Sequence, residues 1–165
     1  MSDIDFRWMV KSNVPEVLRI EQVCFDTPWT EEDFINSMRQ RNCIGMVAER
    51  HGVVLSYMLY CLNKDSIHVI NFAVSPLCQR DGIGTEMVDK LKTKLSQQRR
   101  HTLIVDVRET NLAAQLFWRA NGFEWSQTLR GHYDNDEDAY QFRYRSATEQ
   151  FRPRNRISEF LQGVE

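Results

Sequence analysis

Two glycines separated by one residue, Gly82 and Gly84, carry the clearest chemical signal in this sequence. Glycine has no Cβ, so it accepts positive φ and lets a ligand approach the backbone closely. The apolar spacing of Ile83, Met87 and Leu91 predicts an amphipathic helix that begins at the same point. The unpaired N–H groups and the dipole of a helix start favour a pyrophosphate group. A tight turn before a packed helix, without a ligand, is the alternative.

Two other nucleotide-binding motifs that contain glycines do not fit this segment. A Rossmann fingerprint needs a third small residue where this chain has Met87. A phosphate-binding loop of the Walker type needs a Gly-Lys-Ser/Thr sequence, which is missing here. Neither motif therefore accounts for the glycine pair.

Hydrophobic periodicity and turn residues divide the chain into short strands and helices. Strands are expected at 6–10, 43–49, 53–62, 67–74, 102–107, 125–130 and 139–145. Helices are expected from about 14, 30, 83 and 112, with Ser12 or Asn13 capping the first and Thr30 the second. This pattern predicts an α/β (α+β) fold, a mixed and mostly antiparallel sheet of about seven strands flanked by about four helices, in the order β α α β β β α β α β β. The expected domain spans 4–145, and 146–165 form a tail or short helix.

Charge and composition exclude several classes of protein. The 165 residues include 21 Lys and Arg against 23 Asp and Glu, a formal net charge of −2. A near-neutral balance lacks the basic footprint of a protein that binds nucleic acid or an anionic membrane. No apolar run approaches the roughly 20 residues of a transmembrane helix, and the N-terminus lacks the features of a signal peptide. We therefore expect a cytoplasmic protein.

The four cysteines and four histidines show no metal-binding spacing, and no metal site is predicted. No CxxC pair and no secretion signal accompany the cysteines. We therefore expect reduced core residues at Cys24, Cys43, Cys61 and Cys78. Among the histidines, His132 alone is expected near the functional residues, and more as a loop residue than as a base.

The segment that begins at Phe72 resembles the acetyl-coenzyme A motif of the GNAT superfamily of acetyltransferases. Its Phe-Ala-Val-x-Pro is followed by Gln79-x-x-Gly-x-Gly. Downstream, Asn111-Leu-Ala-Ala and Leu-Phe-Trp-x-x-x-Gly122-Phe are similar to the superfamily's Asn-x-x-Ala and Tyr-x-x-x-Gly-Phe segment. The resemblance covers residues 4–145 and implies the GNAT fold, with transfer of an acetyl group from acetyl-CoA to an amine.

The resemblance also implies which groups hold acetyl-CoA. Backbone N–H groups of Phe72, Ala73 and Val74 would pair with the pantetheine arm and polarise the thioester carbonyl. The side chain of Asn111 would bind the pantetheine as well. The loop expected against the pyrophosphate consists of Gln79, Arg80, Asp81, Gly82, Ile83, Gly84 and Thr85.

Within the superfamily, Phe25-Asp-Thr-Pro28-Trp29-Thr is similar to the Phe-x-x-Pro-Trp-Ser/Thr segment of the ribosomal-protein alanine N-acetyltransferases (RimI type). Arg130-Gly-His-Tyr133, followed by Glu-Asp-Ala, is similar to the closing segment of that family. The resemblance implies that Pro28, Trp29 and Tyr133 line a groove for a protein N-terminus; a turn whose indole fills the core is the alternative. Either a solvated turn or a preference for a basic polypeptide would explain the carboxylates of the last loop, Asp134, Asp136, Glu137 and Asp138.

Two catalytic positions of the family hold different residues in this chain. The family's general base, a Glu, falls at Asp106, whose shorter side chain would act through a water. The family's general acid, a Tyr, falls at Trp118, whose indole N–H cannot release a proton at ordinary pH, so Tyr133 is the alternative acid. An α-amine with a pKa of about 7.8 is about one-seventh neutral at pH 7, against about 0.04% for a lysine near 10.4. An N-terminal acceptor therefore needs less help from a base.

Together these features predict an acetyl-CoA-dependent N-acetyltransferase that acts on a protein N-terminus, such as that of a ribosomal protein. Two alternatives remain from the sequence. One is an acetyltransferase for a small amine, such as a polyamine or an aminoglycoside. The other is a CoA-binding regulatory module that has lost its catalytic chemistry.

Overall fold

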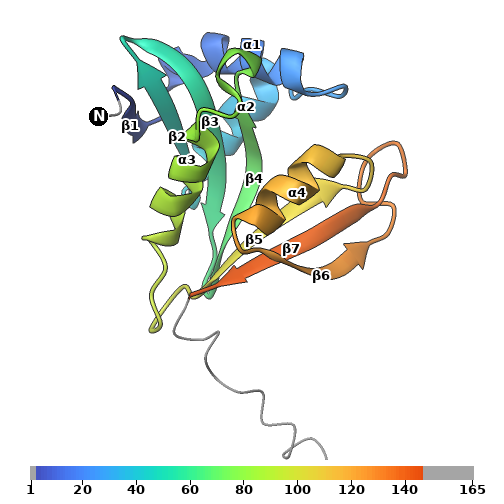
Figure 1. Ribbon diagram of the computed structural model, residues 1–165. Coiled ribbons are helices and arrows are strands. Elements are labelled where there is room, and N and C mark those ends of the chain that lie inside the picture. Colours follow the sequence, from blue (N-terminus) through green and yellow to red (C-terminus); the bar gives the residue numbers. More distant parts are fainter. Residues whose placement is uncertain (1–2, 147–165) are drawn as a thin grey trace, which may run out of the picture.

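A seven-stranded sheet runs through residues 3–146, which are the residues that the computed structural model describes (Figure 1). The strands are β1 (Asp5–Trp8), β2 (Cys43–Arg50), β3 (Val53–Leu62), β4 (Ser66–Val74), β5 (Thr102–Arg108), β6 (Glu124–Leu129) and β7 (Ala139–Arg145). The helices are α1 (Val14–Cys24), α2 (Glu31–Arg39), α3 (Ile83–Lys92) and α4 (Leu112–Ala120), with short 3-10 turns at Lys11–Asn13 and Pro76–Cys78. The predicted fold class and element order are confirmed. The expected tail at 146–165 lies outside the described residues, apart from Ser146.

The strands lie in the order β1-β2-β3-β4-β5-β7-β6. In the described part of the chain, neighbouring strands pair antiparallel except β4 and β5, which pair parallel. A parallel pair needs a crossover connection, and α3 lies in the segment that links these two strands. The parallel pair therefore brings the carboxyl ends of β4 and β5 to the same edge of the sheet.

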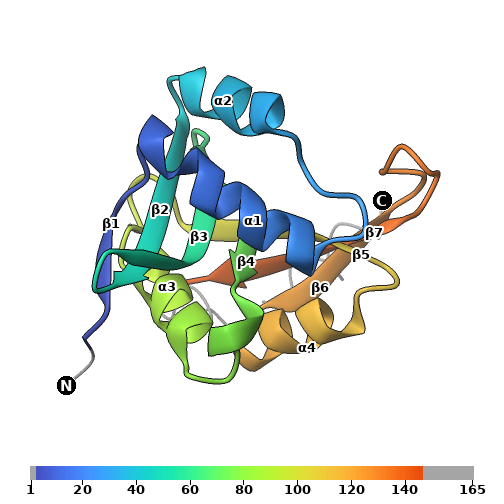
Figure 2. The same ribbon diagram turned by 90° about the horizontal axis from the view of Figure 1, so that it is seen from above.

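Helices cover both faces of the sheet, with α1 and α2 on one face and α3 and α4 on the other (Figure 2). Alternation along β5 directs Leu103, Val105 and Val107 into the core beneath α3 and α4. The intervening residue Asp106 therefore lies on the face that also carries α1 and α2. That face holds a second apolar cluster, which includes Val17 of α1 and Tyr57 of β3.

A local sequence signal explains where α2 begins, but the signal predicted for α1 does not act as expected. Thr30 and Asp33 form the predicted capping box of α2, since Thr30 Oγ1 accepts the Asp33 N–H at 3.2 Å and Asp33 Oδ2 accepts the Thr30 N–H at 2.8 Å. The predicted side-chain cap of α1 was wrong. The Asn13 side chain turns back and accepts the Val10 N–H at 2.9 Å, because a 3-10 turn precedes the helix.

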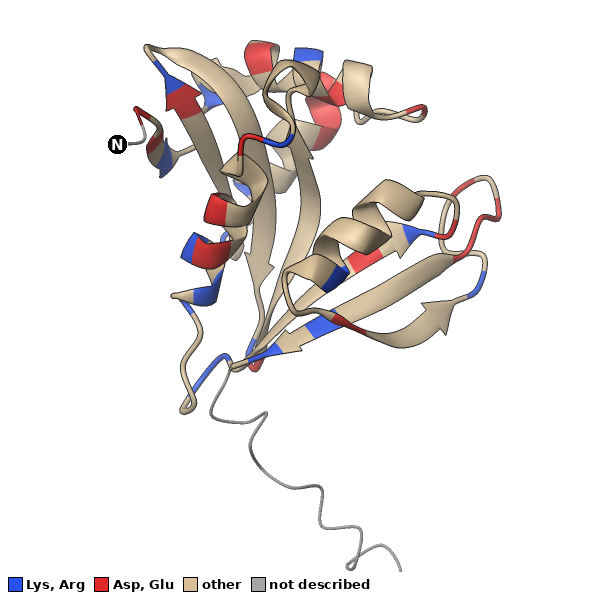
Figure 3. Ribbon diagram, in the orientation of Figure 1, with Lys and Arg blue, Asp and Glu red and all other residues tan. Residues whose placement is uncertain are grey.

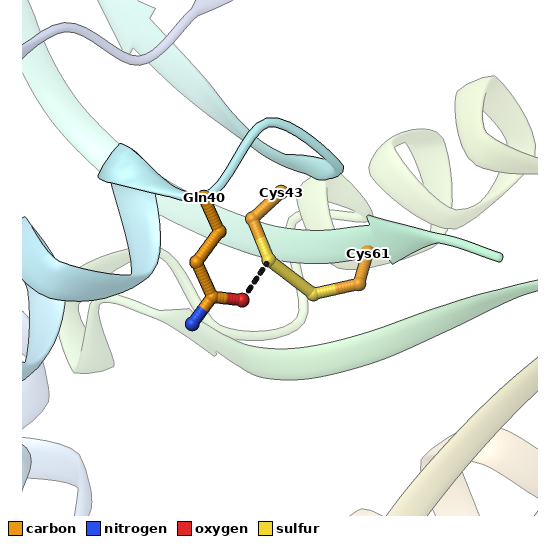
Figure 4. Close-up of a disulfide and its surroundings, with 3 residues drawn as sticks. All are labelled: Gln40, Cys43 and Cys61. Atoms are coloured by element: carbon orange, nitrogen blue, oxygen red, sulfur yellow. Dashed lines mark hydrogen bonds between the residues drawn. A yellow bond between two sulfur atoms is a disulfide. The ribbon is translucent and has the colours of Figure 1, made fainter.

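The expectation of four reduced cysteines was also wrong, because Cys43 and Cys61 form a disulfide (Figure 4). The hairpin of β2 and β3 places these residues directly opposite each other, with their Cα atoms 4.2 Å apart. Cys24 and Cys78 are free thiols. The two bonded cysteines are equally far in sequence from Gly52 in the hairpin turn. The hairpin therefore places them opposite each other, which the spacing between the cysteines alone does not show.

Within residues 3–146, no helix has the length and apolar character needed to cross a membrane. In the same residues, no cluster of three or more His, Cys, Asp or Glu side chains is arranged to hold a metal ion.

Candidate active site

The parallel strands β4 and β5 separate before they end. They pair from Ser66 opposite Thr102 to Val69 opposite Val105, and both strands then continue beyond the last pair. A register shift between β3 and β4 leaves Ile70 as an extra residue at the point of separation. The result is an opening between the two strands toward their carboxyl ends (Figure 1).

Backbone groups of β4 face this opening. The Ser75 N–H donates to the Leu55 carbonyl at 2.7 Å, so it points toward β3. Peptide groups alternate in direction along a strand, so the Ala73 N–H also points toward β3, whereas those of Phe72 and Val74 point toward the opening. Of the three N–H groups predicted to meet pantetheine, Phe72 and Val74 therefore supply the two that face the opening.

The loop after β4 has the geometry of an anion cradle. Arg80 and Gly82 both adopt left-handed backbone conformations, with φ of +75° and +81°. Gly82 is the N-cap of α3, so the N–H groups of the following turn have no preceding helical carbonyl to bind. The Gln79 amide donates to the Val74 carbonyl at 3.2 Å, which ties the loop to the end of β4.

The two glycines of the loop have different surroundings. A Cβ added at Gly82 would meet no protein atom within 4 Å. A Cβ added at Gly84 would lie 3.2 Å from the Phe117 ring and 3.3 Å from the Phe72 ring. Gly84 therefore permits the close packing of α3 on these rings, while the open space at Gly82 leaves room for a ligand. The exposed Asp81 lies between the two left-handed residues.

Asn111 and Trp118 lie at opposite ends of α4. Asn111 is its N-cap, and Asn111 Oδ1 accepts the Ala114 N–H at 3.1 Å, so the predicted hydrogen bond to pantetheine would have to come from Nδ2. Trp118 is 3% exposed, with its ring centroid 5.5 Å from that of Phe72 and 4.8 Å from that of Phe123. The indole is therefore a packed core group next to the strand that borders the opening.

Asp106 lies on the other face of the sheet and is held from two sides. Asp106 Oδ2 lies 3.0 Å from His68 Nε2, and Asp106 Oδ1 accepts the Gln141 Nε2–H at 3.0 Å. Burial alone would raise the pKa of this carboxyl, but the hydrogen bonds from His68 and Gln141 hold it below its ordinary value. His132 Nε2 is 3.7 Å from Oδ2. The expectation that only His132 is near the site was wrong, because His68 on β4 is closer.

The loop between β6 and β7 carries a group of acidic residues (Figure 3). Glu137 accepts hydrogen bonds from the Thr110 hydroxyl and from Arg108, the latter at 2.9 Å, and Asp138 pairs with Arg130 at 2.7 Å. Two of the four loop carboxylates are therefore neutralised within the protein. The exposed pair that can meet a basic ligand consists of Asp134 and Asp136.

Tyr133 also lies in this loop, directly after His132, whose Nε2 atom is 3.7 Å from Asp106 Oδ2. The Arg108 guanidinium carbon lies 3.8 Å from the centroid of the Tyr133 ring, and the ring of His132 meets it edge-on with centroids 4.9 Å apart. Burial raises the pKa of Tyr133 to about 12, with Arg108 opposing the shift and Asp106 adding to it. The hydroxyl therefore keeps its proton at neutral pH and can donate a hydrogen bond.

Pro28 and Trp29 lie in the connection between α1 and α2. Pro28 is exposed, and the half-buried Trp29 packs on Phe34 with ring centroids 5.2 Å apart. Figures 1 and 2 both place this connection at the same end of the sheet as the loop that contains Tyr133. The structure thus gathers the predicted acceptor residues at the end of the sheet where β4 and β5 separate.

Three polar residues of this region were missed by the sequence analysis: His68, Gln141 and Glu21. Glu21 is only 2% exposed, and its carboxylate accepts the Trp29 N–H at 2.9 Å. Its position was detectable, because the spacing from Val14 and Val17 places Glu21 on the buried stripe of α1. His68 and Gln141 gave no comparable signal, since alternation along a strand does not tell which distant side chains share a face.

An opening between parallel strands, a helix start with a left-handed glycine and a carboxylate on the opposite face are the features that the sequence predicted for an acyltransferase site. The chain belongs to the acetyltransferase (GNAT) family, which its sequence matches over residues 14–123. It is 28% identical over 131 residues to the [ribosomal protein bS18]-alanine N-acetyltransferase of Escherichia coli K12, with 78% of this chain and 88% of that protein covered.

Solved structures share the fold. The crystal structure of the ribosomal-protein-S18-alanine N-acetyltransferase from Escherichia coli matches with a TM-score of 0.76 at 23% identity, over 86% of this chain and 93% of that one. Arabidopsis thaliana NAA60 in complex with acetyl-CoA matches with a TM-score of 0.73 at 16% identity, over 87% and 98%. The family match makes the protein an acetyl-CoA-dependent N-acetyltransferase, as its sequence predicted, and the solved structures show that it has the GNAT fold.

Proposed function

We propose that this enzyme acetylates the N-terminal α-amine of a protein, with a ribosomal protein as the favoured acceptor, and that it acts in the cytoplasm. The observation that carries the proposal is the position of Asp106. It lies on the sheet face opposite α3 and α4, where β4 and β5 separate. Acetyl donor and amine would therefore approach the opening from opposite faces. The name of the Escherichia coli relative supports the acceptor class.

On the donor side, the chain's backbone does most of the binding. The loop Gln79–Thr85 would hold the pyrophosphate with the N–H groups at the start of α3, as the left-handed Gly82 and the open space at its Cα favour. The Phe72 and Val74 N–H groups would hold the pantetheine, with the Asn111 amide as a further donor. Bound acetyl-CoA supplies a thioester whose thiol is an acceptable leaving group. A backbone N–H aimed at its carbonyl oxygen stabilises the charge that develops there.

On the acceptor side, side chains supply the groups for binding and for proton transfer. Pro28 and Trp29 would border a groove for the acceptor, and Asp134 and Asp136 would attract a basic polypeptide. Asp106 stabilises the positive charge that develops on the amine nitrogen as it attacks the thioester, and Tyr133 is the proton donor for the departing thiolate. Trp118 packs beside the opening and holds its shape.

Mass spectrometry of matched peptides tests this proposal. The substrate is a basic peptide with a free N-terminal alanine and internal lysines, and its control is the same peptide with a blocked N-terminus. We expect one acetyl group on the free terminus and none on the blocked peptide, because a lysine amine is far less often neutral at pH 7. Faster acetylation of lysines, or of spermidine, than of the terminus would contradict it.

A further inference from the structure

The carboxylate of Asp106 has both oxygens engaged by side chains from neighbouring strands. His68 on β4 contacts Oδ2 and Gln141 on β7 donates to Oδ1, each at 3.0 Å. The side chain of Asp106 is 13% exposed and that of His68 is 28% exposed. Solvent and a substrate therefore reach the imidazole more easily than the carboxylate.

These contacts weaken Asp106 as a proton acceptor. Each hydrogen bond donated to a carboxylate stabilises its anion, and the pKa of Asp106 lies below its ordinary value although burial acts in the other direction. A general base works best when its pKa is near the operating pH. Imidazole is the side chain whose ordinary titration range meets this condition.

The direction of the contact determines which imidazole nitrogen can take a proton. A neutral histidine that donates from Nε2 to a carboxylate keeps its lone pair on Nδ1. The imidazolium formed when Nδ1 accepts a proton is stabilised by the adjacent negative charge, as in the histidine–aspartate pair of serine hydrolases. Gln141 prevents rotation of the carboxylate by binding its second oxygen.

We propose that His68 is the proton acceptor of the transfer reaction, with Asp106 and Gln141 as the positioning residues that orient it; the proposal rests on the amine acetylation argued above. The amine nitrogen forms a C–N bond to the acetyl carbon, and the C–S bond breaks with its electron pair on sulfur. The proton lost by nitrogen passes to Nδ1 of His68. Tyr133 protonates the departing thiolate, and His68 then releases its proton through water to the Tyr133 phenolate, which restores both side chains.

Other titratable and charged groups also face this pair. His132 and Tyr133 come from the loop between β6 and β7, with His132 Nε2 3.7 Å from the carboxylate. Arg108 lies over the Tyr133 ring and pairs with Glu137. His132 is therefore the competing candidate for the same role, and the experiment must separate the two histidines.

The variant His68→Gln is the primary test, because a glutamine amide can still donate to Asp106 but cannot accept the proton. We expect kcat to fall by about 100-fold and the acidic limb of the kcat–pH profile to disappear, with the KM for acetyl-CoA unchanged. His132→Gln should lower kcat by less than about threefold. His51→Asn, in the exposed hairpin turn, is the control and should match the wild type. An unaltered profile in His68→Gln, or loss of the limb in His132→Gln instead, would overturn the proposal.

A second readout does not depend on activity. Nitrogen–proton NMR correlation of the full-length wild type identifies the tautomer of each neutral histidine. We expect the Nε2–H form for His68, and loss of that preference in Asp106→Asn. The Nδ1–H form in the wild type would overturn the proposal even if the enzyme is active. A wild type that acetylates no amine refutes the proposed function instead, and this outcome is distinguishable because the tautomer is measured independently.

Discussion

The carboxylate of Glu21 accepts the backbone N–H of Trp29 at 2.9 Å and ties the connection after α1 to the centre of the protein. Its other oxygen accepts the Tyr57 hydroxyl and the Asn71 amide, the latter at 2.9 Å. Burial and the neighbouring Glu21 raise the pKa of Tyr57, so this hydroxyl remains a donor. A buried carboxylate is costly unless its oxygens are satisfied, and three donors satisfy this one. The position of the acceptor segment at Trp29 therefore depends on a buried carboxylate of α1.

Replacement of Glu21 by alanine leaves these three donors without their acceptor. We expect Glu21→Ala to lower the free energy of unfolding by about 3 kcal/mol and to raise the KM for the peptide more than that for acetyl-CoA. Urea unfolding and steady-state kinetics measure the two effects. Gln22→Ala, one residue on and exposed on the same helix, is the control. Equal changes in both KM values would contradict a specific role in placing the acceptor segment.

A matched pair of glycines tests the cofactor loop. Gly52 and Gly82 have φ of +79° and +81°, and an added Cβ meets nothing within 4 Å at either site. Valine at either position should therefore cost similar stability through backbone strain, on the order of 1–3 kcal/mol. We expect only Gly82→Val to weaken acetyl-CoA binding, by about tenfold or more, because only there must a phosphate approach the backbone. Calorimetric affinities that are equal in the two variants would refute the cofactor assignment.

Tyr133 and Trp118 are the two candidates for the acid that protonates the thiolate, and their surroundings differ. Tyr133→Phe should lower kcat by about 100-fold with acetyl-CoA binding retained, because it removes a proton donor near Asp106. Trp118→Phe should change kcat little, since it keeps an aromatic ring among Phe72 and Phe123. Trp118→Tyr should partly rescue Tyr133→Phe if the family's acid position is still within reach of the thiolate. A Tyr133→Phe variant within twofold of the wild type would show that Tyr133 is not the acid.

Glu137 makes stability depend on pH in the acidic range. Hydrogen bonds lower the pKa of Glu137 from its ordinary 4.5 to about 2, and the bond from Thr110 contributes more than the bond from Arg108. A carboxyl whose pKa is lower in the folded than in the unfolded protein stabilises the folded state at pH values above its unfolded pKa. This stabilisation is lost as the pH falls from about 4.5 through about 2. Glu137→Gln should therefore have a lower Tm than the wild type at pH 6, and the difference should narrow across that window.

The matched control for this experiment is Asp134→Asn, which removes one charge from an exposed position in the same loop. Its Tm should differ little from the wild type at any pH in the series. A constant Tm difference for Glu137→Gln between about pH 5 and pH 2 would show that its hydrogen bonds do not shift the titration.

The Cys43–Cys61 disulfide should stabilise the enzyme without taking part in the reaction. The bond joins residues 18 apart, for which loop-closure entropy gives a stabilisation of about 3 kcal/mol. We expect reductant to lower the Tm of the wild type and to leave that of the Cys43→Ser, Cys61→Ser double variant unchanged. Alkylation of free thiols followed by mass spectrometry should label Cys24 and Cys78 but not the bonded pair before reduction. Labelling of all four cysteines before reduction would contradict the disulfide.

Features that depend on contiguous residues were predictable from the sequence. The capping box at Thr30, the hairpin turn at Gly52 and the helix Leu112–Ala120 follow from local signals, and all are present. The glycine loop and the motifs of the family resemblance are also local features, because a helix start and its phosphate cradle are built from one short segment. Local propensity and periodicity are sufficient for such features, since the residues that interact are close together in the sequence.

Tertiary structure alone decided which distant side chains meet. The pairing of Cys43 with Cys61 depends on hairpin register, and the hydrogen bonds of His68 and Gln141 to Asp106 depend on the order of β4, β5 and β7 in the sheet. A strand's sequence indicates that its residues alternate between faces, but not which strand lies beside it. The acetyltransferase class is therefore readable from the chain, whereas the environment that determines how Asp106 works exists only once the strands have paired.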